Sequence, residues 1–217
     1  MNASRTYAVL TGDLVRSTRL SADQSAGAMQ WLREAADTFD DAHPDTLVGE
    51  LSSFRHDSWQ LLLGRPEQSV RAALFLRARL IRQSDSHTKY DTRIAIGIGT
   101  VERLDEARIS DSRGPAFTLS GKALDALSSH RLAFASADPV HGALSYAVAP
   151  LLDDVVSSWT PAEALAISGA LRGWTQKAIA EDAGSMTQQA VSDALDRARW
   201  HTVKPCLDWL TEHLQQT

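Results

Sequence analysis

The sequence has one cysteine, no long apolar run and no excess of basic residues. A single cysteine, Cys206, allows neither an internal disulfide nor a zinc site built from cysteines. Its place between Pro205 and Leu207 favours a small buried apolar residue over a nucleophile. The longest apolar runs, such as residues 61–63, are too short to cross a bilayer. A formal net charge of −5 argues against nonspecific binding to nucleic acids or membranes as the main activity.

What the sequence does contain indicates a soluble protein with real apolar cores. Its 217 residues are enough for one large domain or two small ones, and 43% of them are hydrophobic. The first residues, MNASRTYAVLTGD, lack the apolar centre of a signal peptide and enter a strand pattern almost at once. We therefore expect a cytoplasmic protein with no membrane partner.

The first 136 residues predict a mixed α+β domain. Apolar periodicity predicts strands at 7–10, 46–51, 58–63, 92–101 and 132–135, and helices at 21–41, 66–84 and 117–127. A turn at residues 55–57 joins the second and third strands. This order is typical of a ferredoxin-like split βαβ core, with helices packed on one face of an antiparallel sheet.

The pattern changes to helix alone after residue 136. Pro139, Pro150 and Pro161 punctuate this part of the chain. We therefore predict three parts, which are an α+β domain at 1–136, a connecting helix at 137–159 and an all-α domain at 160–217.

Residues 175–200 have the spacing of a helix-turn-helix. Gly184 allows a sharp turn between two short amphipathic helices, and Thr187 is placed to cap the second helix. In such a motif the start of the second helix meets base edges in the major groove, where glutamine pairs with adenine and arginine with guanine or phosphate. The residues expected to contact double-stranded DNA are Thr187, Gln188, Gln189, Ser192 and Arg197.

An ordinary helical hairpin is the alternative interpretation of this segment. From residue 160 onward the cations are Arg172, Lys177, Arg197, Arg199 and Lys204, and seven carboxylates outnumber them, so no basic field attracts DNA. The segment nevertheless resembles the helix-turn-helix of bacterial transcription regulators and of sigma-factor promoter-reading regions. The matching residues are Thr175, Gln176, Ile179, Ala180, Gly184, the run 187–192, Leu195, Arg197 and Ala198.

Two aspartates lie at the ends of predicted strands, Asp13 after the first strand and Asp57 in the turn between the second and third. Neighbouring strands would bring these carboxylates together, and paired carboxylates with phosphate oxygens suit Mg²⁺ or Mn²⁺. Two such ions can organise a nucleoside triphosphate for in-line attack. Aspartate is also a common turn residue, so a purely structural role is the alternative.

The first 135 residues resemble the catalytic domain of class III nucleotidyl cyclases, and more closely the short bacterial proteins of the SatD type. Three motifs carry the resemblance. The first is a strand ending in Asp13, followed by Val15, Ser17 and Thr18, and the second is Asp57 before an apolar strand and an alanine-rich helix at 66–74. The third is the alternating strand 93–99, which leads to a helix at 114–122. SatD-type proteins pair a cyclase-like region with a DNA-binding tail.

This resemblance implies Asp13 and Asp57 as metal ligands, with Mg²⁺ or Mn²⁺ and a bound purine or cyclic nucleotide, in a homodimer. The residues implied to contact the nucleotide are Leu14, Arg16, Ser17, Thr18, His56 and Lys122. The sequence also departs from the cyclases, because His56 replaces a glycine, Thr118 and Lys122 replace the transition-state asparagine and arginine, and Ser53 replaces the purine-selecting lysine. Lysine offers a point charge where arginine offers a planar fork. These departures favour nucleotide binding over turnover.

Three functions remain open on this basis. The first is a DNA-binding transcription regulator whose degenerate cyclase-like domain senses a nucleotide or dimerises. The second is an active, divergent metal-dependent cyclase or related nucleotidyltransferase with a regulatory tail. The third is a non-enzymatic protein-interaction module. Thr118 and Lys122 favour the first over the second, and Asp13 and Asp57 disfavour the third.

Overall fold

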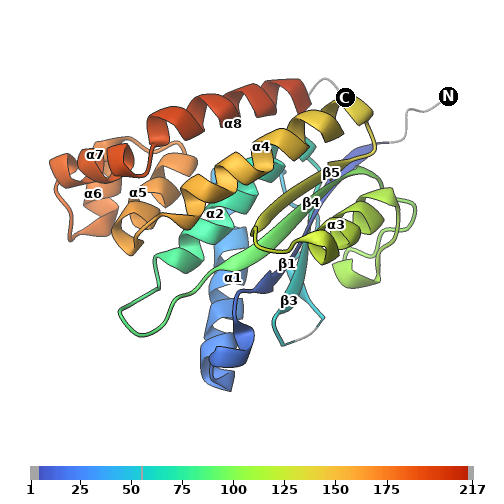
Figure 1. The fold of residues 1–217 in the computed structure, drawn as a ribbon, viewed down its shortest axis with the longest axis horizontal. Coiled ribbons are helices and arrows are strands. Elements are labelled where there is room, and N and C mark those ends of the chain that lie inside the picture. The colour runs from blue at the N-terminus through green and yellow to red at the C-terminus, as the bar shows by residue number, and fades with distance from the viewer. Residues whose placement is uncertain (1–4, 55, 215–217) are drawn as a thin grey trace.

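The structure, a computed structural model, describes residues 5–54 and 56–214, with side chains for all of these except 140, 141 and 143–146. Figure 1 shows a sheet with helices packed on it and a group of C-terminal helices at one end. The elements are β1 (Thr6–Leu14), α1 (Ala22–Ala42), β2 (Ser52–Ser53), β3 (Ser58–Leu63), α2 (Ser69–Ile81), β4 (Thr92–Thr100), α3 (Pro115–Ala126), β5 (Leu132–Ser136), α4 (Pro139–Ser157), α5 (Pro161–Leu171), α6 (Gln176–Ala183), α7 (Gln188–Arg197) and α8 (Trp200–Leu214), with short 3₁₀ helices η1 (Ser17–Arg19), η2 (Pro66–Gln68) and η3 (Ile109–Asp111).

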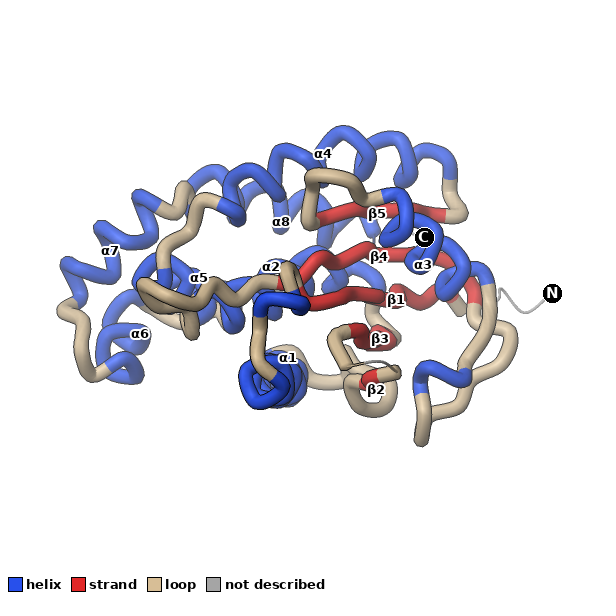
Figure 2. Tube along the Cα trace, turned by 60° about the horizontal axis from the view of Figure 1, so that its bottom comes forward, coloured by secondary structure: helices blue, strands red, loops and turns tan. Residues whose placement is uncertain are grey.

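The sheet has the order β2-β3-β1-β4-β5. The first four strands pair antiparallel, and β5 is added parallel to β4 at the edge (Figure 2). The order of β1 to β4 is that of a ferredoxin-like split βαβ core, so the predicted α+β class is confirmed. A parallel pair requires a crossover connection, and α3 provides the one between β4 and β5.

Helices cover both faces of the sheet, so the expectation of helices on one face is wrong for α3. Strand β4 alternates isoleucine with small residues, and the isoleucines join the main core beneath α1 and α2. The opposite face carries Gly97, where an added Cβ would come within 2.3 Å of the Ala116 carbonyl oxygen of α3. The small residues therefore let α3 pack directly on the strand backbone.

The expectation of a strand at 46–51 is also wrong. Strand β2 comprises only Ser52 and Ser53, and Leu47 makes an isolated bridge to Leu63. The chain bends away because Gly49 has a φ of 70°, outside the extended region. In addition, Asp40 draws the backbone toward α1, because its carboxylate accepts hydrogen bonds from the amides that begin this segment. Arg55, expected in the next turn, lies outside the described residues.

The C-terminal helices share the main core with the sheet. That core runs without a break from β1 and α2 into α5, α7 and α8, and α5 packs against α2. Helix α5 starts with a capping box, in which Thr160 and Glu163 exchange hydrogen bonds, and Pro161 occupies its first position. Among the described residues no helix is long and apolar enough to cross a membrane.

Candidate functional site

Asp13 lies at the end of β1, where it forms an ion pair with a cation that the sequence analysis did not consider. Its partner is Arg93 on β4, directly opposite in the register. Arg93 donates from Nε to one oxygen of Asp13 at 2.8 Å and from Nη2 to the other. This hydrogen bond, together with the carboxylate charge, raises the pKa of Arg93 despite partial burial. Both oxygens of Asp13 are therefore engaged by a guanidinium.

Asp57 lies beside Asp13, since the carbonyl oxygen of Asp57 accepts from the amide of Leu14 at 2.9 Å. Its carboxylate is held by serine hydroxyls, with Ser17 Oγ at 2.6 Å from Oδ2 and Ser58 Oγ at 3.2 Å from Oδ1. Strands β1 and β3 pair, which meets the condition for bringing the two aspartates together. The two aspartates thus lie at adjacent strand ends with different partners.

An open hollow of about 560 Å³ lies on the Asp57 side of this sheet end. It gathers three of the residues implied to contact a nucleotide, Ser17, Thr18 and His56, around Asp57. Ser25 from α1 and the exposed ring of Phe54 complete its lining. Five of the six residues that line the hollow have polar side chains, and the hollow is open to solvent.

The other expected nucleotide residues lie elsewhere. Leu14 is buried and faces the core, so only its backbone reaches the sheet end. Arg16 lines a different cavity, on the α2 side of the same sheet end. Lys122 is exposed on α3, four residues after the exposed Thr118, and neither lines the hollow.

As arranged, Asp13 and Asp57 do not fit a divalent metal ion. A hard cation requires free carboxylate oxygens, and those of Asp13 already accept from Arg93. Within the described ranges no cluster of three or more histidine, cysteine, aspartate or glutamate side chains is placed to hold a metal. A metal at this position therefore needs Arg93 to leave Asp13.

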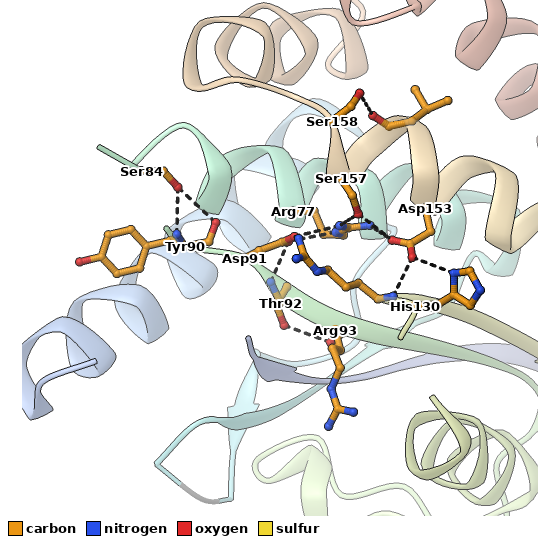
Figure 3. A network of polar contacts seen from close by, with 12 residues as sticks. Arg77, Ser84, Tyr90, Asp91, Thr92, Arg93, His130, Asp153, Ser157 and Ser158 are labelled. Carbon is orange, nitrogen blue, oxygen red and sulfur yellow. Dashed lines mark hydrogen bonds and ion pairs between the residues drawn. The ribbon is translucent and has the colours of Figure 1, made fainter. Parts of the chain in front are cut away.

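A buried network of charges, which the sequence analysis missed, links the sheet to the C-terminal helices (Figure 3). Arg77 of α2, with a fully buried side chain, donates from Nε and Nη2 to Asp91 at 3.0 and 2.9 Å. Its Nη1 donates to Asp153 of α4 at 2.7 Å. Arg131, before β5, donates to Asp91 at 2.6 Å, and Ser157 closes the network between Arg77 and Asp153.

The network keeps both signs of charge ionised in an apolar setting. Burial alone raises the pKa of Asp91, but Arg77 and then Arg131 outweigh it by charge and hydrogen bonding, and the pKa falls below its usual value. The sequence carried one signal of this arrangement. Arg77 lies on the apolar period of α2 between Leu74 and Leu80, and a cation on a buried face needs buried partners.

Helices α6 and α7 are joined by a tight turn of the predicted kind. Thr175 caps α6 and Thr187 caps α7, each accepting from a backbone amide three residues on. Gly184 ends α6 with a φ of 62°, a left-handed conformation that glycine adopts without strain. Helix α7 buries its apolar side, which includes Val191 and Leu195, against its neighbours.

The residues expected to contact DNA lie on α7 and its cap. Thr187, Gln188 and Gln189 are exposed, and Gln189 donates to Asp193 at 2.8 Å. The remaining two are Ser192, which accepts from Gln176 of α6 at 3.5 Å, and Arg197, whose Nε donates to Glu163 at 3.3 Å. The first three are thus exposed, although the side chains of Thr187 and Gln189, like that of Arg197, have partners within the chain.

Comparison with known proteins gives neighbours in structure only. No protein-family model matches the chain, and no curated protein matches it. The guanylyl cyclase Cya2 is 15% identical with a TM-score of 0.46, covering 61% of this chain and 76% of the cyclase. A bacterial light-regulated adenylyl cyclase is also 15% identical, with a TM-score of 0.45, covering 61% of this chain and 44% of its own length. No family membership follows from similarity at this level.

Proposed function

We propose that this chain is a transcription regulator that binds double-stranded DNA through α6 and α7, while its sheet region senses a nucleotide and pairs two copies of the chain. The observation that carries this proposal is the start of α7. There Gln188 and Gln189 are exposed directly after the cap Thr187, on a helix whose other side is buried. Exposed glutamines at this position suit contacts to base edges in the major groove.

The DNA proposal predicts different losses for different residues of α7. Gln188→Ala and Gln189→Ala should each weaken binding to a preferred sequence by about 1–3 kcal/mol and relax sequence preference. Arg197→Ala should weaken all sequences alike, because a phosphate contact carries no base information. Fluorescence anisotropy with the full chain, at low salt, measures both, using DNA from upstream of its own coding sequence and random DNA of equal length.

The matched control is Gln30→Ala, an exposed glutamine on α1 whose side chain donates to Glu34. It should bind DNA as the unchanged chain does. Equal affinity for upstream and random DNA would contradict self-regulation, and no affinity for any DNA would make α6 and α7 a protein-contact surface.

Light scattering of the same sample tests the homodimer, which a two-fold operator requires. A monomer at micromolar concentration would contradict the proposed homodimer.

We further propose that Mg²⁺ or Mn²⁺, with a nucleotide, binds at Asp13 and Asp57 only in exchange for Arg93. Arg93→Met should therefore raise Mn²⁺ affinity about tenfold, since loss of one charge-assisted pair frees two oxygens. Asp13→Asn and Asp57→Asn should each lower it. Titration of Mn²⁺ followed by electron paramagnetic resonance measures all three variants.

Asp154→Asn is the control for this titration, because Asp154 is exposed on α4 and outside the hollow. Unchanged Mn²⁺ affinity in all three variants would make the aspartates structural residues of the sheet end. Product analysis of the same samples with nucleoside triphosphates separates binding from turnover.

A further inference from the structure

A second cavity, of about 290 Å³, lies on the α2 side of the sheet end, away from the Asp57 hollow. Its walls come from the loop after β1, the end of α2 with the loop that follows, the residue before β5, and the segment joining α4 to α5. The polar or charged residues in these walls that matter here are Arg16, Lys89, Asp91, Arg131, Ser157 and Thr160. This cavity touches both the sheet and the C-terminal helices.

The cavity has an excess of positive charge. In the adjoining network, Arg77 and Arg131 balance Asp91 and Asp153. Arg16 and Lys89 add two further cations, both exposed, and neither side chain has an ion pair or hydrogen bond with another described residue, while the carboxylate of Asp85 is near enough to interact with the charge of Lys89. Arg131 also keeps donors beyond the one that Asp91 accepts. Arg16, Lys89 and the free donors of Arg131 therefore offer three cationic groups to an anion in the cavity.

The wall formed by Trp159 and Thr160 is bonded to the end of α7 by two routes. Trp159 donates from Nε1 to the carbonyl oxygen of Ala198, the C-cap of α7, at 3.1 Å. The amide of Thr160 donates to Glu163 Oε2 at 2.8 Å, and the other oxygen of Glu163 accepts from Arg197. Displacement of this wall therefore changes the surroundings of Arg197.

We propose that this cavity binds a small phosphomonoester dianion and that its occupancy is transmitted through Trp159 and Thr160 to the end of α7. Guanidinium groups bind phosphate oxygens through paired donors, and an ammonium adds a point charge. The cavity volume suits a small phosphorylated molecule and no polymer. Phosphate binding at this cavity does not depend on the proposed function. Only an effect of bound phosphate on DNA affinity would rest on the proposal that α6 and α7 bind DNA.

The test is a titration of the ¹⁵N-labelled full chain, followed by nuclear magnetic resonance, with inorganic phosphate, AMP and adenosine as probes. Phosphate and AMP should shift the Trp159 indole and Thr160 amide signals, and then those of Arg197 and Ala198. Adenosine should shift none of them. A response to AMP alone would place the base in the recognition, whereas equal responses to AMP and phosphate would assign it to the anion.

Two variants remove one cation each without touching the buried network. Lys89→Gln and Arg16→Asn should each weaken phosphate binding about tenfold, which corresponds to about 1.4 kcal/mol. Asparagine is chosen because Arg16 has a φ of 57°, which asparagine tolerates. Lys177→Gln, on α6 and outside the cavity, changes net charge equally and should leave binding unchanged.

The proposal is overturned by any of three results. Trp159 and Thr160 signals that move with neither phosphate nor AMP would exclude the site. A loss of binding in Lys177→Gln as large as that in Lys89→Gln would make the effect one of net charge. Signals of Arg197 and Ala198 that stay fixed while the cavity signals move would overturn the transmission. The titration contains no DNA, so its result does not depend on whether the chain binds DNA.

Discussion

Replacing Asp91 with asparagine is expected to lower the free energy of unfolding by about 3–5 kcal/mol. Asp91 accepts two hydrogen bonds from Arg77, whose side chain is 0% exposed, and one from Arg131. Asparagine keeps the shape but removes the charge, so Arg77 stays buried with only Asp153 as an ionised partner. Urea unfolding followed by circular dichroism measures the change.

The control is Asp154→Asn, which alters the exposed neighbour of Asp153 on α4 and should change stability by no more than about 0.5 kcal/mol. In the double variant Arg77→Met with Asp91→Asn, the free energy of unfolding should fall by less than the sum of the falls in the two single variants, because no unpaired arginine remains. Equal losses for Asp91→Asn and Asp154→Asn would mean that the network does not hold α2 to the sheet.

The Asp91 contribution should also depend on pH in one direction. Because the pKa of Asp91 is lowered in the folded protein, its stabilisation is present above the unfolded value of about 3.9 and is lost as pH falls through the folded pKa. The stability difference between the unchanged chain and Asp91→Asn should therefore be constant near neutral pH and shrink in acid below about pH 4.

Most elements of the fold could be predicted from apolar periodicity. The strands around Val9, Leu62 and Ile96 and the helices around Leu32 and Leu74 lie where the pattern places them. Local capping was also readable, because Thr187 and Gly184 act through neighbours a few residues away. The strand at 46–51 failed because Asp40, a residue on a preceding helix, captures its amides. Local patterns do not report such a contact.

The candidate site was harder to predict, because its partners come from distant parts of the sequence. Proximity of Asp13 and Asp57 followed from strand adjacency, but the ion pair with Arg93 depends on the exact register of β1 against β4. Likewise, Arg77 and Asp153 meet only because α4 crosses back over α2. Charge pairs across such separations follow from the tertiary arrangement and not from spacing.

Placing an alanine at Gly97 is expected to destabilise the protein by about 1–3 kcal/mol or more, through overpacking. The new Cβ would lie 2.3 Å from the carbonyl oxygen of Ala116 and 2.5 Å from the amide of Ser120, both in the α3 backbone. Backbone atoms cannot rotate away as a side chain does, so α3 must move off β4. The hydrogen bond between the hydroxyls of Thr11 and Ser120, at 2.8 Å, would then lengthen or break.

Gly121→Ala, next to Ser120 in the same helix, provides a control with the opposite expected sign. An added Cβ at Gly121 meets no atom within 4 Å, and alanine favours a helix over glycine by about 1 kcal/mol, so this variant should be more stable than the unchanged chain. Thermal unfolding of both variants separates the effect of the contact between position 97 and the α3 backbone from the effect of helix propensity. Two changes of the same sign would contradict the close packing of α3 on β4.

That packing fixes the height above the sheet of the α3 face that carries Thr118 and Lys122. Gly97→Ala therefore tests how α3 is held on the sheet without altering Asp13, Asp57 or any residue that lines the hollow.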